Sequence, residues 1–131
     1  MGGLFVGRVA GNFVNEDLLV SIEYGCKVSG AKFVLVLGHE SCGAIKSAID
    51  DVKMGNITAM LAKIKSAIAR SQDFNGDKTS KNPAFVEYVA KNNVMETIKT
   101  KSPILKEMLD KGEIKIIGGY YNIHSSEVIF L

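Results

Sequence analysis

The chain has 131 residues, of which 47% are hydrophobic and 23% charged, so it is long enough for one globular domain with an apolar core. Its formal net charge is only +2, with the lysines spread along the chain, which argues against nucleic acid or an anionic membrane surface as a partner. No apolar run is long enough to span a membrane, and two cysteines do not make a disulfide framework, so we expect a single domain, 1–131, in the reducing cytoplasm.

The first part of the chain predicts a strand, a helix and a second strand. Leu4–Val9 is an apolar, β-branched run typical of a strand, and Ala10-Gly11-Asn12 follows it as a turn. Glu16–Ser29 repeats apolar residues with the spacing of one helix face. Lys32–Leu37 is the nearly continuous apolar run of a strand buried on both faces. Together these segments predict a βαβ unit with a parallel sheet.

The middle of the chain predicts helices separated by a polar loop. The apolar spacing of Ile57–Arg70 indicates one amphipathic helix, and the polar stretch Gln72–Lys81 indicates an exposed loop. Asn82-Pro83 and Ser102-Pro103 each place an N-capping residue before a proline, which is a start signal for a helix. We expect the first of these two helices to run as far as Thr100.

The end of the chain predicts two strands. Gly112 ends the second of these helices, Glu113–Gly119 indicates a strand, and Val128–Leu131 indicates another after a hairpin-like connection. The succession of elements as a whole predicts an α/β fold with a mostly parallel β-sheet flanked by helices.

The stretch from Gly38 to Gly43 is the most informative for function, because it joins a predicted parallel strand to a helical pattern that runs to Lys53. Ligand sites of open α/β sheets lie at the carboxyl ends of strands. Imidazole and thiolate are good zinc ligands, and His39 and Cys42, three residues apart across the turn, can face one ion. The first helical turn favours the thiolate of Cys42, and the two glycines allow the backbone to pass close to the site. Taken alone, this spacing also fits a buried cysteine beside a loop histidine.

Several motifs in the same order resemble those of the β-class carbonic anhydrases. Gly38–Ala44 is similar to the second zinc-ligand motif of that family, G-H-x-x-C-G-A, and Leu4–Asn12 is similar to its L-F-V-x-R-N-A-G-N. Further matches are Ile22-Glu23-Tyr24, Ser102-Pro103-Ile104-Leu105, Gly119-Tyr120-Tyr121 and Val128-Ile129-Phe130-Leu131. The chain is therefore identified as a member of this family, corresponding to its C-terminal portion.

The resemblance implies a zinc enzyme that reversibly hydrates carbon dioxide to bicarbonate through a zinc-bound hydroxide, with His39 and Cys42 as metal ligands. It also implies a homodimer or a higher homo-oligomer. The other residues that it assigns are Gly38, Gly43, Ala10, Gly11 and Asn12 near the site, and Arg8 and Tyr121 as interface candidates. For Tyr121 a place in the core is favoured over the interface.

The resemblance breaks at one zinc ligand. In the family, the first cysteine belongs to a C-x-D-S-R motif that should precede Leu4, and the sequence contains no such motif. We therefore expect a family domain that is truncated at its N-terminus and holds half of a zinc site. Candidates for the missing ligand are Cys26, on a helix face expected to be buried, Glu40, and His124 in the terminal hairpin.

Two other functions stay open at this point. One is a non-catalytic relative that folds and oligomerises as an interaction protein without a complete zinc site. The other is a related zinc enzyme that acts on carbonyl sulfide or carbon disulfide.

Overall fold

The computed structural model describes residues 2–99 and 101–131. The elements in chain order are α1 (Glu16–Lys27), β1 (Phe33–His39), α2 (Gly43–Ile49), α3 (Gly55–Ala62), α4 (Lys65–Arg70), α5 (Pro83–Thr97), α6 (Pro103–Asp110), β2 (Lys115–Tyr121) and β3 (Val128–Phe130). The predicted start signals are confirmed, because the side chain of Asn82 accepts a hydrogen bond from the Ala84 amide and that of Ser102 accepts one from the Leu105 amide. Within the described residues, no helix is long and apolar enough to cross a membrane.

The described strands form a mixed sheet in the order β1-β2-β3. The longer pairing, between β1 and β2, is parallel and runs from Phe33 opposite Lys115 to His39 opposite Tyr121. The shorter pairing, between β2 and β3, is antiparallel and runs from Gly119 opposite Phe130 to Tyr121 opposite Val128. The predicted α/β fold is therefore confirmed, and so is the terminal hairpin.

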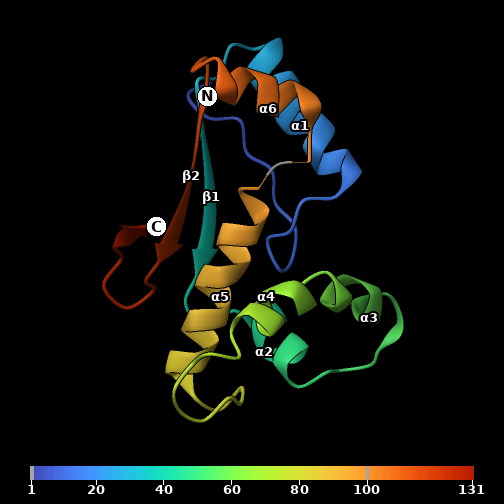
Figure 1. The fold of residues 1–131 in the computed structure, drawn as a ribbon, viewed down its shortest axis with the longest axis vertical. Helices are drawn as coiled ribbons and strands as arrows, with labels where there is room; N and C mark the ends of the chain where they lie inside the picture. The colour runs from blue at the N-terminus through green and yellow to red at the C-terminus, as the bar shows by residue number, and fades with distance from the viewer. Residues whose placement is uncertain (1, 100) are drawn as a thin grey trace.

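Helices cover one face of this sheet (Figure 1). The sheet is seen nearly edge-on there, and α1, α5 and α6 all lie on the same side of it. On the opposite face, Phe33 is 52% exposed, and Leu35 and Leu37 are each 40% exposed. A strand that was expected to be buried on both faces is thus covered on one, and an apolar surface is left open.

Two glycines bring α5 close to the sheet. A Cβ atom on Gly38 or on Gly118 would lie 2.7 Å from a methyl group of Val94, which is fully buried in α5. Real Cβ atoms do not approach other atoms so closely, so the helix can pack at this distance only because both positions lack a side chain. The contact fixes the height of α5 above the carboxyl half of β1.

Buried apolar side chains form two clusters, one at each end of the sheet. The cluster at the carboxyl end of β1 joins α2, α3, α4 and α5 around Tyr120, which is 2% exposed. The cluster at the amino end joins α1 and α6 around Cys26 and Ile114. The turn after β1 therefore lies beside the first cluster and away from the second.

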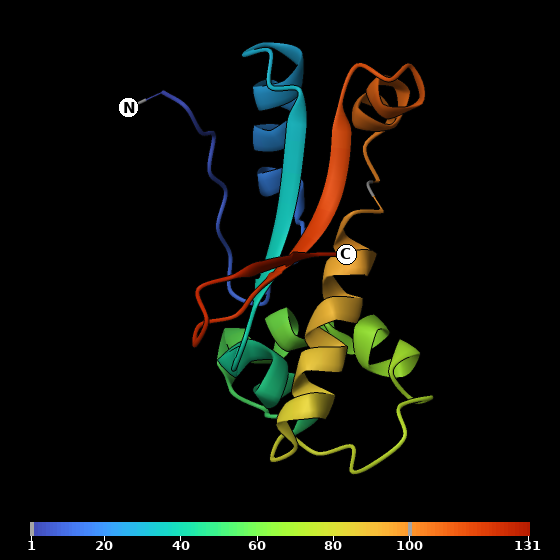
Figure 2. The ribbon, with the colours of Figure 1, turned by 90° about the vertical axis from the view of Figure 1, so that its left-hand side faces the viewer.

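The prediction of a strand at Leu4–Val9 is wrong. This segment runs as an irregular coil and makes no strand pairing within the described residues (Figure 2). Its apolar side chains are exposed, 87% for Leu4 and 70% for Val6. An extended run becomes a strand only when a neighbouring strand takes up its backbone hydrogen bonds, and none lies beside it here. The predicted βαβ unit is therefore reduced to α1 followed by β1.

Two predicted helix boundaries also need correction. The helix expected at Ile57–Arg70 is interrupted between Ala62 and Lys65, where the amides of Lys63 and Ile64 bond to carbonyls three residues back. This tighter turn redirects the chain and buries Ile64 completely. The helix expected to reach Thr100 ends at Thr97, and Thr100 itself lies outside the described residues.

The close approach of α5 predicts a penalty for any side chain at Gly38. The substitution Gly38→Ala should lower the free energy of unfolding by about 1–3 kcal/mol, because the new methyl group overlaps Val94. Urea denaturation measures this change. Adding Val94→Ala should relieve part of the overlap, so the loss in the double variant should be smaller than the sum of the two single losses.

The matched control is Gly43→Ala, since a Cβ atom there would meet no atom within 4 Å. This control should be neutral or slightly stabilising. Equal effects of the two glycine substitutions would contradict the packing argument.

Candidate metal centre

The turn at the carboxyl end of β1 carries both predicted zinc ligands. His39 is the last residue of β1, and Cys42 is the N-cap residue of α2, immediately before the first helical turn. Ser41 between them has a φ of 55°, in the left-handed region that few residues other than glycine adopt. The predicted strand-to-helix turn is therefore confirmed, and Ser41 supplies its sharp bend.

The ring of His39 is held in one tautomer. Its Nδ1 atom lies 2.8 Å from the carbonyl oxygen of Glu40. A carbonyl oxygen only accepts hydrogen bonds, so Nδ1 carries the proton and Nε2 keeps a free lone pair. Metal-binding histidines commonly donate their other ring N–H to a backbone carbonyl, a carboxylate or a water molecule in this way. The side chain is exposed, and its Nε2 is therefore available to an ion.

Cys42 is half-buried and packs against the apolar cluster at the carboxyl end of the sheet. Its carbonyl accepts the first hydrogen bond of α2, from Lys46, while its side chain makes no capping hydrogen bond. The thiol is free. Cys42 and His39 thus offer one sulfur and one nitrogen atom from the two ends of the same short turn.

The turn at residues 10–12 is tied to this end of the sheet. The side chain of Asn12 donates a hydrogen bond to the Leu37 carbonyl at 3.0 Å, two residues before His39. Asn93 of α5 donates to the Gly11 carbonyl at 2.8 Å, and Thr97 donates to the Asn12 carbonyl at 2.9 Å. The structure therefore brings Ala10, Gly11 and Asn12 near the predicted site, although the segment before them is not a strand.

Glu40 and His124 bind each other across the site. The Nδ1 atom of His124 lies 2.7 Å from Oε2 of Glu40, and the Ile123 amide donates to the same oxygen at 3.0 Å. The hydrogen bond from His124 lowers the pKa of Glu40 below its ordinary value. Both side chains are therefore engaged in holding the β2–β3 hairpin to the turn.

Cys26 lies at the opposite end of the sheet from His39. It is 3% exposed and packs with Leu105, Met108 and Ile114, near the amino end of β1. Seven residues of β1 separate the two ends by roughly 20 Å. Burial raises the pKa of the Cys26 thiol, which opposes the thiolate form that a metal needs. Cys26 is therefore not a ligand of an ion held by His39 in this chain.

The described residues do not complete a metal centre. No group of three or more histidine, cysteine, aspartate or glutamate side chains that could hold a metal ion exists in residues 2–99 and 101–131. A catalytic zinc ion normally has three protein ligands and one open position. The donor types at His39 and Cys42 suit zinc, but their number falls one short.

The remaining predicted residues have other surroundings. Arg8 is exposed and makes no ion pair within the described part of the chain. A Cβ atom on Gly43 would meet open space, so no close approach requires a glycine there. Tyr121 is half-buried, whereas its neighbour Tyr120 is the buried tyrosine of the carboxyl-end core. The core position that was favoured for Tyr121 is therefore taken by Tyr120, because adjacent strand residues face opposite sides of the sheet, and the interface role of Tyr121 stays a prediction.

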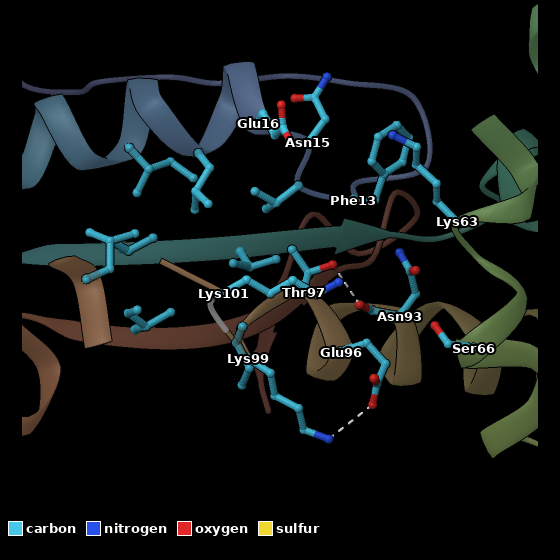
Figure 3. A pocket seen from close by; sticks show the side chains of 18 of the residues that line it. Phe13, Asn15, Glu16, Lys63, Ser66, Asn93, Glu96, Thr97, Lys99 and Lys101 are labelled. Atoms are coloured by element: carbon cyan, nitrogen blue, oxygen red, sulfur yellow. Dashed lines mark hydrogen bonds and ion pairs between the residues drawn. The ribbon is translucent and has the colours of Figure 1, made fainter. Parts of the chain in front are cut away.

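A groove of about 930 Å³ lies between α1 and α5 (Figure 3). Its lining residues include Val34, Val36 and Ile116 of the sheet. Polar side chains at its rim already bind each other. Glu96, for example, pairs with Lys99 of the same lining, and also with Arg70 outside it. His39 and Cys42 do not line this groove, so it is separate from the candidate metal centre.

Comparison with known proteins gives one consistent family. The family model described as "Carbonic anhydrase" matches residues 1–128. The chain is 28% identical over 133 residues to a carbonic anhydrase of Mycolicibacterium smegmatis, covering 98% of this chain and 63% of that protein. It is 30% identical over 146 residues to a carbonic anhydrase of Synechococcus elongatus, covering 98% of this chain and 51% of that protein. The chain therefore spans between about half and two thirds of the length of these relatives.

Solved structures agree on the fold. A tetrameric β-carbonic anhydrase from Sordaria macrospora superposes with a TM-score of 0.84 at 24% identity, over 97% of this chain and 67% of that one. A Coccomyxa β-carbonic anhydrase in complex with acetazolamide superposes with a TM-score of 0.80 at 22% identity, over 97% of this chain and 60% of that one.

Proposed function

Because the chain belongs to the carbonic anhydrase family, we propose that it takes part in the reversible hydration of carbon dioxide to bicarbonate, with His39 and Cys42 as two of the ligands of a zinc ion. The turn that joins β1 to α2 is the observation that carries this proposal. It presents an imidazole with a free Nε2 atom and a free thiol at the carboxyl end of a parallel strand.

In the finer proposal, a zinc ion held by His39 and Cys42 would supply a hydroxide ion near neutral pH for the attack on carbon dioxide, and the described residues give this ion two protein ligands in place of the usual three. Glu40 and His124 are occupied with each other, and Cys26 lies at the far end of the sheet. With two protein ligands, zinc is held weakly, and a high zinc concentration is needed to fill the site.

The same shortage of ligands supports a second candidate function. In this second function, the chain is a non-catalytic relative that folds and associates with other subunits. The turn after β1 is then what is left of the family's metal centre. Enzymatic activity in the presence of added zinc separates this function from the first.

Hydration of carbon dioxide by the 131-residue chain should be detectable in excess zinc and should depend on both residues of the turn. Stopped-flow measurement with a pH indicator gives the rate. His39→Ala and Cys42→Ala should each lower it to that of buffer with the same zinc concentration, because each removes one of only two protein ligands. Carbonyl sulfide and carbon disulfide are assayed in parallel to identify the preferred substrate.

The chain offers a matched control of each residue type. His124→Ala removes the other histidine, and Cys26→Ala removes the other cysteine, at positions outside the proposed ligand set. Both variants should keep the wild-type rate once their folding is verified by circular dichroism. A wild-type rate equal to that of zinc-containing buffer would rule out the enzymatic function for this chain and favour the non-catalytic one.

We also propose that the chain forms a homo-oligomer through the open face of its sheet. Leu35 and Leu37 are exposed on this face, and Gly119 lies between them and Val128 of β3. Contiguous apolar surface of this kind is typical of subunit interfaces.

Sedimentation velocity over a range of protein concentrations should show a dimer or larger species. Leu37→Lys should shift the population toward monomer, because it places a charge in the apolar contact. The exposed control Lys32→Gln should not. A wild-type chain that stays monomeric at high concentration would contradict this assignment.

A further inference from the structure

A second pocket, of about 360 Å³, lies beside the candidate metal centre. It is lined by the turn after β1, by α2, by the segment that leads into α5, by the first turns of α5, and by Tyr120 of β2. The zinc-ligand candidates His39 and Cys42 are not among its lining residues. Its residues are therefore free to bind a ligand independently of a metal.

Hydrogen-bond donors dominate the lining. Ser41, Lys46, Ser80, Lys81 and Tyr120 all carry donor groups. Within residues 2–99 and 101–131, the polar atoms of these side chains form no hydrogen bond and no ion pair with the protein. Unpaired donors that converge from four separate segments indicate a ligand that accepts hydrogen bonds.

The hydroxyl group of Tyr120 is the strongest member of this set. The residue is only 2% exposed, yet its hydroxyl has no partner among the described residues. No fully buried side-chain polar atom of the described chain lacks a partner, so this hydroxyl must be the part of the side chain that reaches the pocket. Burial, together with the charges of Glu87 and Glu40, raises the pKa of Tyr120 to about 12. The phenol therefore stays protonated and acts as a donor.

The two carboxylates in the lining are already satisfied. Glu40 accepts hydrogen bonds from His124 and from the Ile123 amide. Glu87 forms an ion pair with Lys91, one helical turn further along α5. The carboxylates of the pocket thus already have partners, whereas the ammonium groups of Lys46 and Lys81 do not. The unpaired charges that line the pocket are therefore positive.

We propose that this pocket binds a small oxyanion, such as inorganic phosphate or bicarbonate, between the two lysines and the hydroxyl of Tyr120. Charge-assisted hydrogen bonds from ammonium and hydroxyl donors are the contacts that such an ion requires. The volume suffices for an ion of a few heavy atoms with water around it, since a water molecule takes about 30 Å³.

Isothermal titration calorimetry tests the proposal with inorganic phosphate and, separately, with bicarbonate. Metal-free buffer at low ionic strength keeps the result independent of the proposed zinc chemistry. Wild-type protein should bind at least one of the two ions. Tyr120→Phe should weaken binding by about tenfold or more, because it removes a single hydroxyl that donates to a charged acceptor. Lys81→Gln should also weaken binding, through the loss of one positive charge.

Matched controls lie elsewhere on the surface. Tyr24→Phe changes an exposed tyrosine of α1, and Lys115→Gln changes an exposed lysine at the start of β2; both should bind like the wild type. If Tyr120→Phe does not fold, Lys81→Gln, on an exposed segment, decides the question. Binding of phosphate alone or of bicarbonate alone supports the site and identifies its ion. No binding of either ion to the wild type, or equal binding by wild type, Tyr120→Phe and Lys81→Gln, overturns the proposal.

Discussion

The packing of Val94 over the two glycines of neighbouring strands is the contact on which the rest of the structure depends. It sets the distance between α5 and the parallel pair β1–β2, at the half of the sheet where both strands end. Asn93, the residue before Val94, and Thr97 then hold the turn at residues 10–12. The same end of the sheet carries His39, Cys42 and Tyr120. A larger side chain at Gly38 or Gly118 would therefore disturb every candidate functional group at once.

This arrangement explains why the turn after β1 carries two donor groups of the kind that zinc prefers, and why it lacks a third. β1 ends at His39, the chain turns at the left-handed residue Ser41, and α2 begins after its N-cap residue Cys42, so the two candidate ligands stand at the two ends of one short turn. The tautomer of His39 is set by the backbone of the turn itself. The described chain adds no third donor at this turn, where the carboxylate of Glu40 already binds His124 and the Ile123 amide.

Local sequence patterns predicted the elements that are determined by neighbouring residues or by a long apolar run. The caps at Asn82 and Ser102, the strand at Lys32–Leu37 and the strand-to-helix turn all follow from residues close in sequence or from strong apolar runs. The strand at Leu4–Val9 failed because a strand needs a partner backbone, which sequence pattern alone does not reveal. The break at Lys63 was hidden because apolar spacing continues across it. Tyr120 was overlooked because only the strand register decides which of two adjacent tyrosines is buried.

Zinc retention by the purified 131-residue chain tests the central claim, that the turn at His39 and Cys42 is half of a metal centre. The protein is loaded with zinc, dialysed against a weak chelator and examined by elemental analysis. The structure predicts far less than about one zinc ion per chain, because two protein ligands hold the ion too weakly to survive dialysis. Retention of close to one ion per chain would contradict this account, since it would require a third ligand that the described residues do not bring to the turn.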